Sequence, residues 1–209
     1  ASFAFVQQYR FAAADTATPA FRPKAISWVL AGGLAAAVIG PQTVIHTRDL
    51  FAPIAFAGAY VGQAVLCLTA IAFLAFVRVP RPPRLPLGAP RGRPILHVLA
   101  EPKVAIAVLC ALVSYAAMSL MMTAAPLAIV FCGFTTDEAA LGIQWHVMAM
   151  FGPSFFTGSL IARFGAGRVT GAGLLLLAAA AVMGLAGIEL VNFWLALVLL
   201  GLGWNFGFI

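Results

Sequence analysis

Residues 78–94 read Arg-Val-Pro-Arg-Pro-Pro-Arg-Leu-Pro-Leu-Gly-Ala-Pro-Arg-Gly-Arg-Pro, with five arginines and six prolines. Long apolar runs flank this stretch, Phe51 to Val77 before it and Val104 to Phe131 after it. Proline at this density excludes a continuous helix, and arginine at this density excludes burial in lipid. We therefore predict a solvated loop between two groups of membrane-spanning helices, rather than a Pro-rich ligand of a partner domain.

The remaining charges repeat this arrangement along the chain. Eleven of the twelve Lys and Arg residues lie in every second gap between apolar runs: Arg10, Arg22, Lys24, Arg78, Arg81, Arg84, Arg91, Arg93, Lys103, Arg163 and Arg168. The other gaps hold one basic residue, Arg48, against the acidic residues Asp49, Asp137, Glu138 and Glu189. Because basic loops stay in the cytoplasm, loops 10–24, 78–103 and 163–168 are predicted to be cytoplasmic, and loops 46–50, 132–140 and 188–192 to lie outside.

Composition also indicates a protein dissolved in lipid. The chain is 63% hydrophobic and 9% charged, with a mean hydropathy of +1.04. A soluble domain of 209 residues would have too little polar surface to cover such a core. The net charge of +6 is therefore interpreted as cytoplasmic anchoring against anionic lipid, and no nucleic-acid partner is expected. The three cysteines form no CxxC or Cys/His pair, so we expect neither a metal site nor a disulfide framework. No cofactor is expected.

Six runs are long enough, or nearly so, to cross the hydrocarbon layer as helices. They cover residues 25–45, 51–77, 104–131, 141–162, 169–188 and 192–209, and residues 1–8 resemble the tail of an earlier span. The fold class predicted is an all-α, polytopic transmembrane bundle. Residues 1–77 would end one helix bundle, residues 78–103 would form the central loop, and residues 104–209 would begin a second bundle. Both ends of the chain lie within apolar runs, so we expect an internal piece of a longer protein.

The spans carry polar groups without deep charges. Candidate cavity residues are Gln63, Tyr115, Thr123, Gln144, His146 and Asn205. His146 titrates near neutral pH and is a candidate for a solute or proton path, although a hydrogen bond to a neighbouring helix is the alternative for it, Gln144 and Asn205. The GxxxG pairs Gly58–Gly62 and Gly203–Gly207 predict close helix packing. No acid, base, nucleophile or metal cluster converges in the sequence, so we do not expect an enzyme.

Two local patterns resemble those of major facilitator superfamily (MFS) transporters. Gly40-Pro41, preceded by Gly32, Gly33 and Ala36, is similar to the glycine–proline pattern of the family's fifth helix. Residues 158–168, Gly-Ser-Leu-Ile-Ala-Arg-Phe-Gly-Ala-Gly-Arg, are similar to the second-half copy of its cytoplasmic G-x-L-A-D-R-x-G-R-K loop, with Ala162 in place of the Asp. Two bundles joined by a long basic loop also resemble that family.

The resemblance implies a function and a set of moving parts. The chain would run from the end of the family's helix four to its helix ten, in a bacterial inner membrane. It would transport a small, neutral or amphipathic organic solute by alternating access, with proton coupling as a family expectation. The remaining helices of a full-length chain would be partners. Gating residues would be Gly40, Pro41, Gly158, Arg163, Gly165 and Arg168.

Two other functional classes stay open at this point. One is a polytopic membrane enzyme acting on a lipid-linked substrate, and the other is a non-transporting scaffold or receptor. The sequence leaves the substrate, the direction of transport, the coupling ion and the oligomeric state undetermined.

Overall fold

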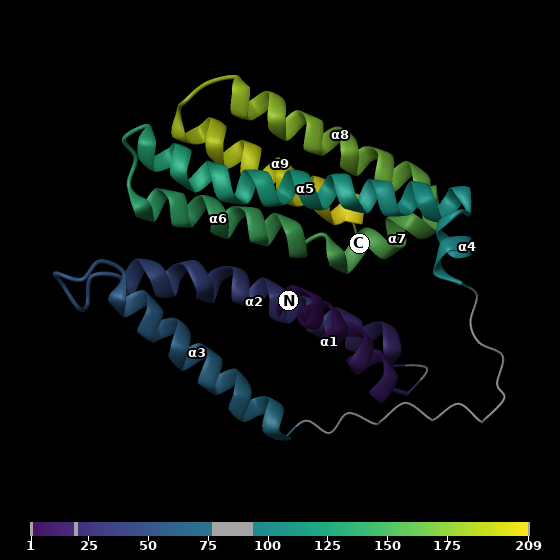
Figure 1. Cartoon of the computed structure of the whole chain (residues 1–209), viewed down its shortest axis with the longest axis horizontal. Coiled ribbons are helices and arrows are strands. Elements are labelled where there is room, and N and C mark those ends of the chain that lie inside the picture. The colour runs from purple at the N-terminus through teal and green to yellow at the C-terminus, as the bar shows by residue number, and fades with distance from the viewer. Residues whose placement is uncertain (1, 19–20, 77–93, 209) are drawn as a thin grey trace.

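The computed structural model describes residues 2–18, 21–76 and 94–208, and the regular elements in these ranges are helices. In chain order they are α1 (Ser2–Thr16), α2 (Arg22–Thr47), α3 (Ala57–Phe76), α4 (Ile95–Leu99), α5 (Pro102–Phe131), α6 (Thr136–Phe151), α7 (Ser154–Phe164), α8 (Ala166–Leu185) and α9 (Leu190–Phe208) (Figure 1). The all-α fold class is confirmed. Most of the predicted central loop, residues 77–93, lies outside the described residues.

Five helices, α2, α3, α5, α8 and α9, are long and apolar enough to cross a membrane. Helices α6 and α7 meet the same criteria of length and composition as a pair, which is bent by 42° at a break after Phe151. The break lies at Gly152 and Pro153, where the proline cannot donate a backbone hydrogen bond. Six spans were predicted, and the described residues provide six when the bent pair counts as one.

Several boundaries differ from those predicted. The second span begins at Ala57 rather than at Phe51, because turns around Pro53 precede it. Helix α1 continues through the first predicted loop as far as Thr16. Helix α6 begins at Thr136, five residues before the predicted Leu141, because Thr135 and Glu138 form a reciprocal capping box.

The helices fall into two groups in Figure 1, which we call the first half (α1–α3) and the second half (α4–α9). The core of the second half lies between α5, α6, α8 and α9. Its buried members are Ala125, Ile129, Ala139, Leu177, Ala180, Leu197 and Leu200. Helix α9 is central to this core, and its Trp204 and Asn205 are fully buried.

Glycines set the closest helix approaches in both halves. A Cβ atom at Gly173 of α8 would lie 2.8 Å from the carbonyl oxygen of Gly203 in α9, so the two backbones touch. In the first half, a Cβ atom at Gly58 would overlap the carbonyl of Thr47, and one at Gly62 would lie 2.7 Å from Thr43 Cγ2. A Cβ atom at Gly207 would lie 2.8 Å from Ser114 Oγ of α5, so all four members of the predicted GxxxG pairs mark helix contacts.

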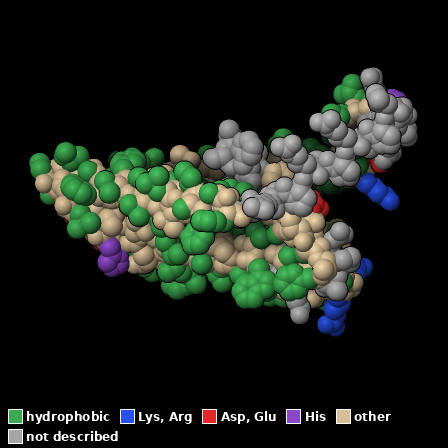
Figure 2. All heavy atoms as spheres, turned by 90° about the horizontal axis from the view of Figure 1, so that it is seen from below, with side chains coloured by type: hydrophobic (Ala, Val, Ile, Leu, Met, Phe, Trp, Pro, Cys, Tyr) green, Lys and Arg blue, Asp and Glu red, His purple; other side chains and the backbone are tan. Residues whose placement is uncertain are grey.

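The junctions of the helices alternate between the two ends of the molecule (Figure 1). The α2–α3, α5–α6 and α8–α9 junctions share one end, which we call the outer end, and the α1–α2 and α7–α8 junctions share the other, the inner end. Hydrophobic side chains cover much of the face in Figure 2, with Lys and Arg side chains only towards one end of that view. This alternation is what the charge pattern requires, and the pattern itself predicts that the inner end is cytoplasmic.

Candidate functional site

The candidate site is the interface where α2 of the first half packs along α6 of the second half. Gln42 Nε2 donates a hydrogen bond of 2.9 Å to Gln144 Oε1 across it. Deeper in the interface, a Cβ atom at Gly33 would lie 3.1 Å from the ring of Phe151. The two helices run in opposite directions, so the C-terminal end of α2 meets the N-terminal end of α6 at the outer end.

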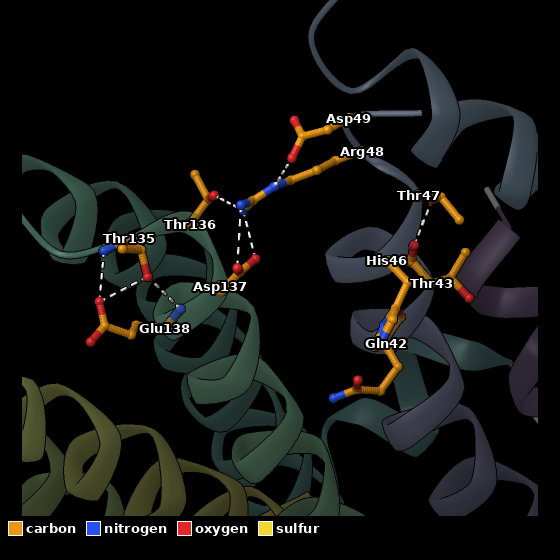
Figure 3. Close-up of polar contacts among 10 residues, drawn as sticks. All are labelled: Gln42, Thr43, His46, Thr47, Arg48, Asp49, Thr135, Thr136, Asp137 and Glu138. Atoms are coloured by element: carbon orange, nitrogen blue, oxygen red, sulfur yellow. Dashed lines mark hydrogen bonds and ion pairs between the residues drawn. The ribbon is translucent and has the colours of Figure 1, made fainter. Parts of the chain in front are cut away.

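Arg48, the residue after α2, reaches across to the start of α6 (Figure 3). Its Nη1 and Nη2 atoms donate to the two carboxylate oxygens of Asp137, at 2.6 and 3.2 Å. Nη1 also donates to Thr136 Oγ1, and Nε donates to Asp49 at 3.1 Å. A bidentate arginine–carboxylate pair fixes orientation as well as distance.

The start of α6 is held from its other side. Thr135 Oγ1 accepts from the Glu138 backbone N–H at 3.2 Å, and Glu138 Oε2 accepts from the Thr135 backbone N–H at 2.7 Å (Figure 3). Trp194 Nε1 of α9 donates to the Glu138 carbonyl at 3.0 Å. The carboxylate of Asp137 is therefore presented by a helix start that is fixed to the second-half core.

A cavity of about 660 Å³ lies beside this interface, between both halves. Its lining is mostly apolar, with the polar side chains Thr43, Tyr60, Gln63 and Thr136 among Gly40, Pro41, Val44, Phe56, Ala59, Leu66, Pro126, Leu127, Val130, Ala139, Ala140 and Ile143. These residues come from the outer portions of α2, α3, α5 and α6 and from the turn before α3. An apolar cavity with a few polar groups is the usual form of a small-molecule site.

The six predicted cavity residues lie in different parts of the structure, and only one of them lines the cavity. Gln63 lines the cavity, and Gln144 lies at the α2–α6 interface. Tyr115 and Thr123 lie on exposed parts of α5 and do not line the cavity, and Thr123 Oγ1 donates to the Ser119 carbonyl at 2.9 Å. His146 is fully buried within the second half, where its Nδ1 lies 2.9 Å from the Leu197 carbonyl oxygen and must carry the proton, since a carbonyl only accepts.

Asn205 also lies away from the cavity, inside the break between α6 and α7. Its Nδ2 donates to the Met150 carbonyl and to Ser154 Oγ, both at 2.7 Å. Its Oδ1 accepts from Thr157 Oγ1 at 2.6 Å, and that hydroxyl also lies 2.8 Å from the Pro153 carbonyl. One buried amide of α9 thus supplies hydrogen bonds to both sides of a helix break, as lipid-embedded backbone requires.

The predicted gating residues lie in two places. Gly40 and Pro41 line the cavity, and Gly40 has open space where a Cβ would stand. At the inner end, Gly165 alone joins α7 to α8, with a φ of +83° that favours glycine. The Arg163 guanidinium lies 5.3 Å from the ring centroid of Phe164, and Arg168 lines a cleft of about 220 Å³ with Leu160, Phe164, Val169, Ala172 and Phe206. Gly158 is exposed on α7.

Four polar residues that bond across the interface were not among those predicted, namely Gln42, Arg48, Thr136 and Asp137. One signal for them was in the sequence, because Arg48 is the basic residue that departs from the alternating charge pattern. Among the residues described, no group of three His, Cys, Asp or Glu side chains is arranged to hold a metal ion.

Comparison with known proteins extends over nearly the whole chain. The riboflavin transporter RfnT of Brucella anthropi is 50% identical over 98% of this chain and 52% of its own length. The uncharacterized MFS-type transporter YddS of Bacillus subtilis is 30% identical over 96% of this chain and 50% of its own length, and YdeG of the same organism is 37% identical over 44% of this chain and 22% of its own.

The chain therefore spans about half the length of the first two of these relatives. No family model matches it, and no solved structure matches it significantly. The relatives are named as transporters, which does not support the membrane-enzyme alternative. Together with the apolar helices, they identify the chain as part of a multi-pass protein of the bacterial inner membrane, and it belongs to the major facilitator superfamily.

Proposed function

We propose that the protein carries riboflavin, or a closely related neutral flavin, across the inner membrane by alternating access. The observation that carries this proposal is the 50% identity with a riboflavin transporter, sustained over 98% of the chain. An alignment over that much of the chain includes both halves, the α2–α6 interface and the cavity.

The charge distribution of the spans supports a neutral solute. Within the spans that the structure describes, acidic side chains occur only at the outer start of α6, as Asp137 and Glu138. The cavity offers hydroxyl and amide groups on an apolar surface, which suits a planar ring system with polar edges. Its volume of about 660 Å³ falls within the range of about 300–1,000 Å³ typical of small-molecule sites.

The proposed solute contacts are Gln63 and its neighbours in the cavity. Gln63 and Tyr60 lie one helical turn apart on α3, and Thr43 faces them from α2. Pro41, beside them, removes one backbone donor from α2 and permits a bend there. Such a bend would let the two halves change their relative tilt around the solute. The α7–α8 junction, with Arg163, Gly165 and Arg168, would form the corresponding contact at the inner end.

Uptake of riboflavin by the intact protein tests the proposal. Cells that cannot synthesise riboflavin should take it up when they produce the protein, and flavin mononucleotide should compete poorly, because its phosphate adds charge that the cavity does not balance. Gln63→Leu should raise the KM for riboflavin by about fivefold, the value of one hydrogen bond of about 1 kcal/mol. Thr69→Val is the matched control, since Thr69 lies on α3 outside the cavity and bonds only its own helix at Val65.

Proton coupling is a separate part of the proposal. Riboflavin accumulation should increase under an inward proton gradient and fall when an ionophore removes that gradient. If the rate of riboflavin uptake is the same with and without the proton gradient, proton coupling is refuted but transport itself is not. A protein that binds riboflavin but moves none of it would instead favour the receptor alternative.

A further inference from the structure

Arg48 is the single basic residue in the segments that the charge pattern assigns to the outside. A lone cation in such a position is usually a solvated surface residue. Here its side chain is only 21% exposed, and Asp137 opposite is 39% exposed. Its guanidinium donates hydrogen bonds to the second half, to both carboxylate oxygens of Asp137 and to Thr136 Oγ1 (Figure 3).

The position of this pair matters as much as its geometry. Arg48 and Asp137 stand 89 residues apart, on opposite sides of the central loop. The polar contacts described between the two halves, Arg48 with Asp137 and Thr136, and Gln42 with Gln144, are gathered towards the outer end. Thr136 accepts a hydrogen bond from Arg48 and also lines the cavity. Opening the outer end would therefore require the Arg48 contacts to break, together with the Gln42–Gln144 bond.

We propose that Arg48 and Asp137 form an outer latch, which holds the two halves together above the cavity and biases the protein towards its outer-closed state. This proposal rests on the proposed transport function, because a protein that does not change conformation would have no need to open such a latch. A partly exposed pair suits this task. It is strong enough to bias a two-state equilibrium, and water at its rim can solvate both charges when they separate.

Distances between spin labels on the two halves test the latch without any solute. In the intact protein, with Cys67, Cys110 and Cys132 replaced, labels at Ile54 and Ile188 report on the outer end, since both side chains are about two-thirds or more exposed. Labels at Phe76 and Phe164 report on the inner end. Arg48→Ala should raise the ratio of outer-open to outer-closed molecules by about three- to tenfold, the effect of one partly exposed, bidentate pair.

Matched variants separate the latch from a general loss of stability. Asp137→Ala should match Arg48→Ala, and the reversed pair Arg48→Asp with Asp137→Arg should restore the short outer distance. Asp49→Ala is the control, because Asp49 is 79% exposed and bonds Arg48 from the same half. Unchanged outer distances in Arg48→Ala would overturn the latch, as would equal effects of Arg48→Ala and Asp49→Ala. If the protein does not take up riboflavin but the variants still show these changes in label distance, the proposed substrate is wrong and the latch is still supported.

Discussion

Replacing Asn205 with leucine removes one buried side chain whose hydrogen bonds connect α9 to both sides of the α6–α7 break. Leucine has the same number and branching of side-chain heavy atoms as asparagine, so the substitution deletes the polar contacts while keeping the branched shape of the side chain. Three partners lose a hydrogen bond: the Met150 carbonyl, Ser154 Oγ and Thr157 Oγ1. Thr157 keeps its bond to the Pro153 carbonyl, so its loss is partial.

The expected cost follows from these contacts. A buried acceptor left without a donor costs about 1–3 kcal/mol, and interhelical hydrogen bonds in membranes average about 0.6 kcal/mol. All three bonds cross between α9 and a neighbouring helix, and the Met150 carbonyl also lies beside the break. We expect Asn205→Leu to lower the free energy of unfolding by about 2–3 kcal/mol, and Thr157→Val, which removes a single donor, by about 1 kcal/mol.

Denaturant unfolding of the intact protein in detergent measures these differences. Asn192→Leu is the matched control on the same helix, since Asn192 lies in its first turn and is only partly buried. It should change the unfolding free energy by less than about 0.5 kcal/mol. If Asn205→Leu proves as stable as the Asn192 control, the side chain does not stabilise the break and the reasoning fails.

Three further substitutions test the packing and the helix ends. Gly201→Ala places a methyl group against the His146 carbonyl and 3.0 Å from the Met150 backbone nitrogen, so it should cost more than about 2 kcal/mol by thermal unfolding, whereas Gly158→Ala has open space and should be neutral or slightly stabilising. Thr135→Ala removes the side-chain acceptor of the α6 capping box and should cost about 1 kcal/mol in the same assay, and no loss would contradict the capping role. Gly165→Ala forces a side chain onto a φ of +83° and should cost about 1 kcal/mol, and a smaller effect would show that the junction relaxes.

The sequence predicted the features of the fold that depend on composition within one segment. Apolar runs predict spans because every stretch of the helix must suit the hydrocarbon layer. The charges beside them predict the alternation of the junctions, which Figure 1 shows at the two ends. GxxxG pairs predict close contacts for the same local reason, and Gly58 and Gly62 do seat α3 against α2.

Features that depend on two distant segments were beyond such reasoning. Pro153 was visible in mid-span, but the sequence did not show that Asn205, about 50 residues later, supplies the hydrogen bonds at that break. Asp137 was assigned to an outer loop of 132–140, and the structure instead places it in the first turn of α6. Its partner is 89 residues away, so neither residue carries a local signal for the other.

The structure divides the polar residues of the spans by whether their hydrogen bonds are already used. His146, Thr157 and Asn205 are at least 98% buried and are bonded within the second half, so a solute would have to break those bonds and enter a packed core to reach them. In a low-dielectric interior, each broken bond leaves a costly unpaired group. Gln63 has no such burial and lines the space between the halves. A polar side chain in a membrane helix is therefore a candidate for solute recognition only when its hydrogen-bonding groups are not already used within the fold. By this criterion Gln63 is a better candidate than His146 or Asn205.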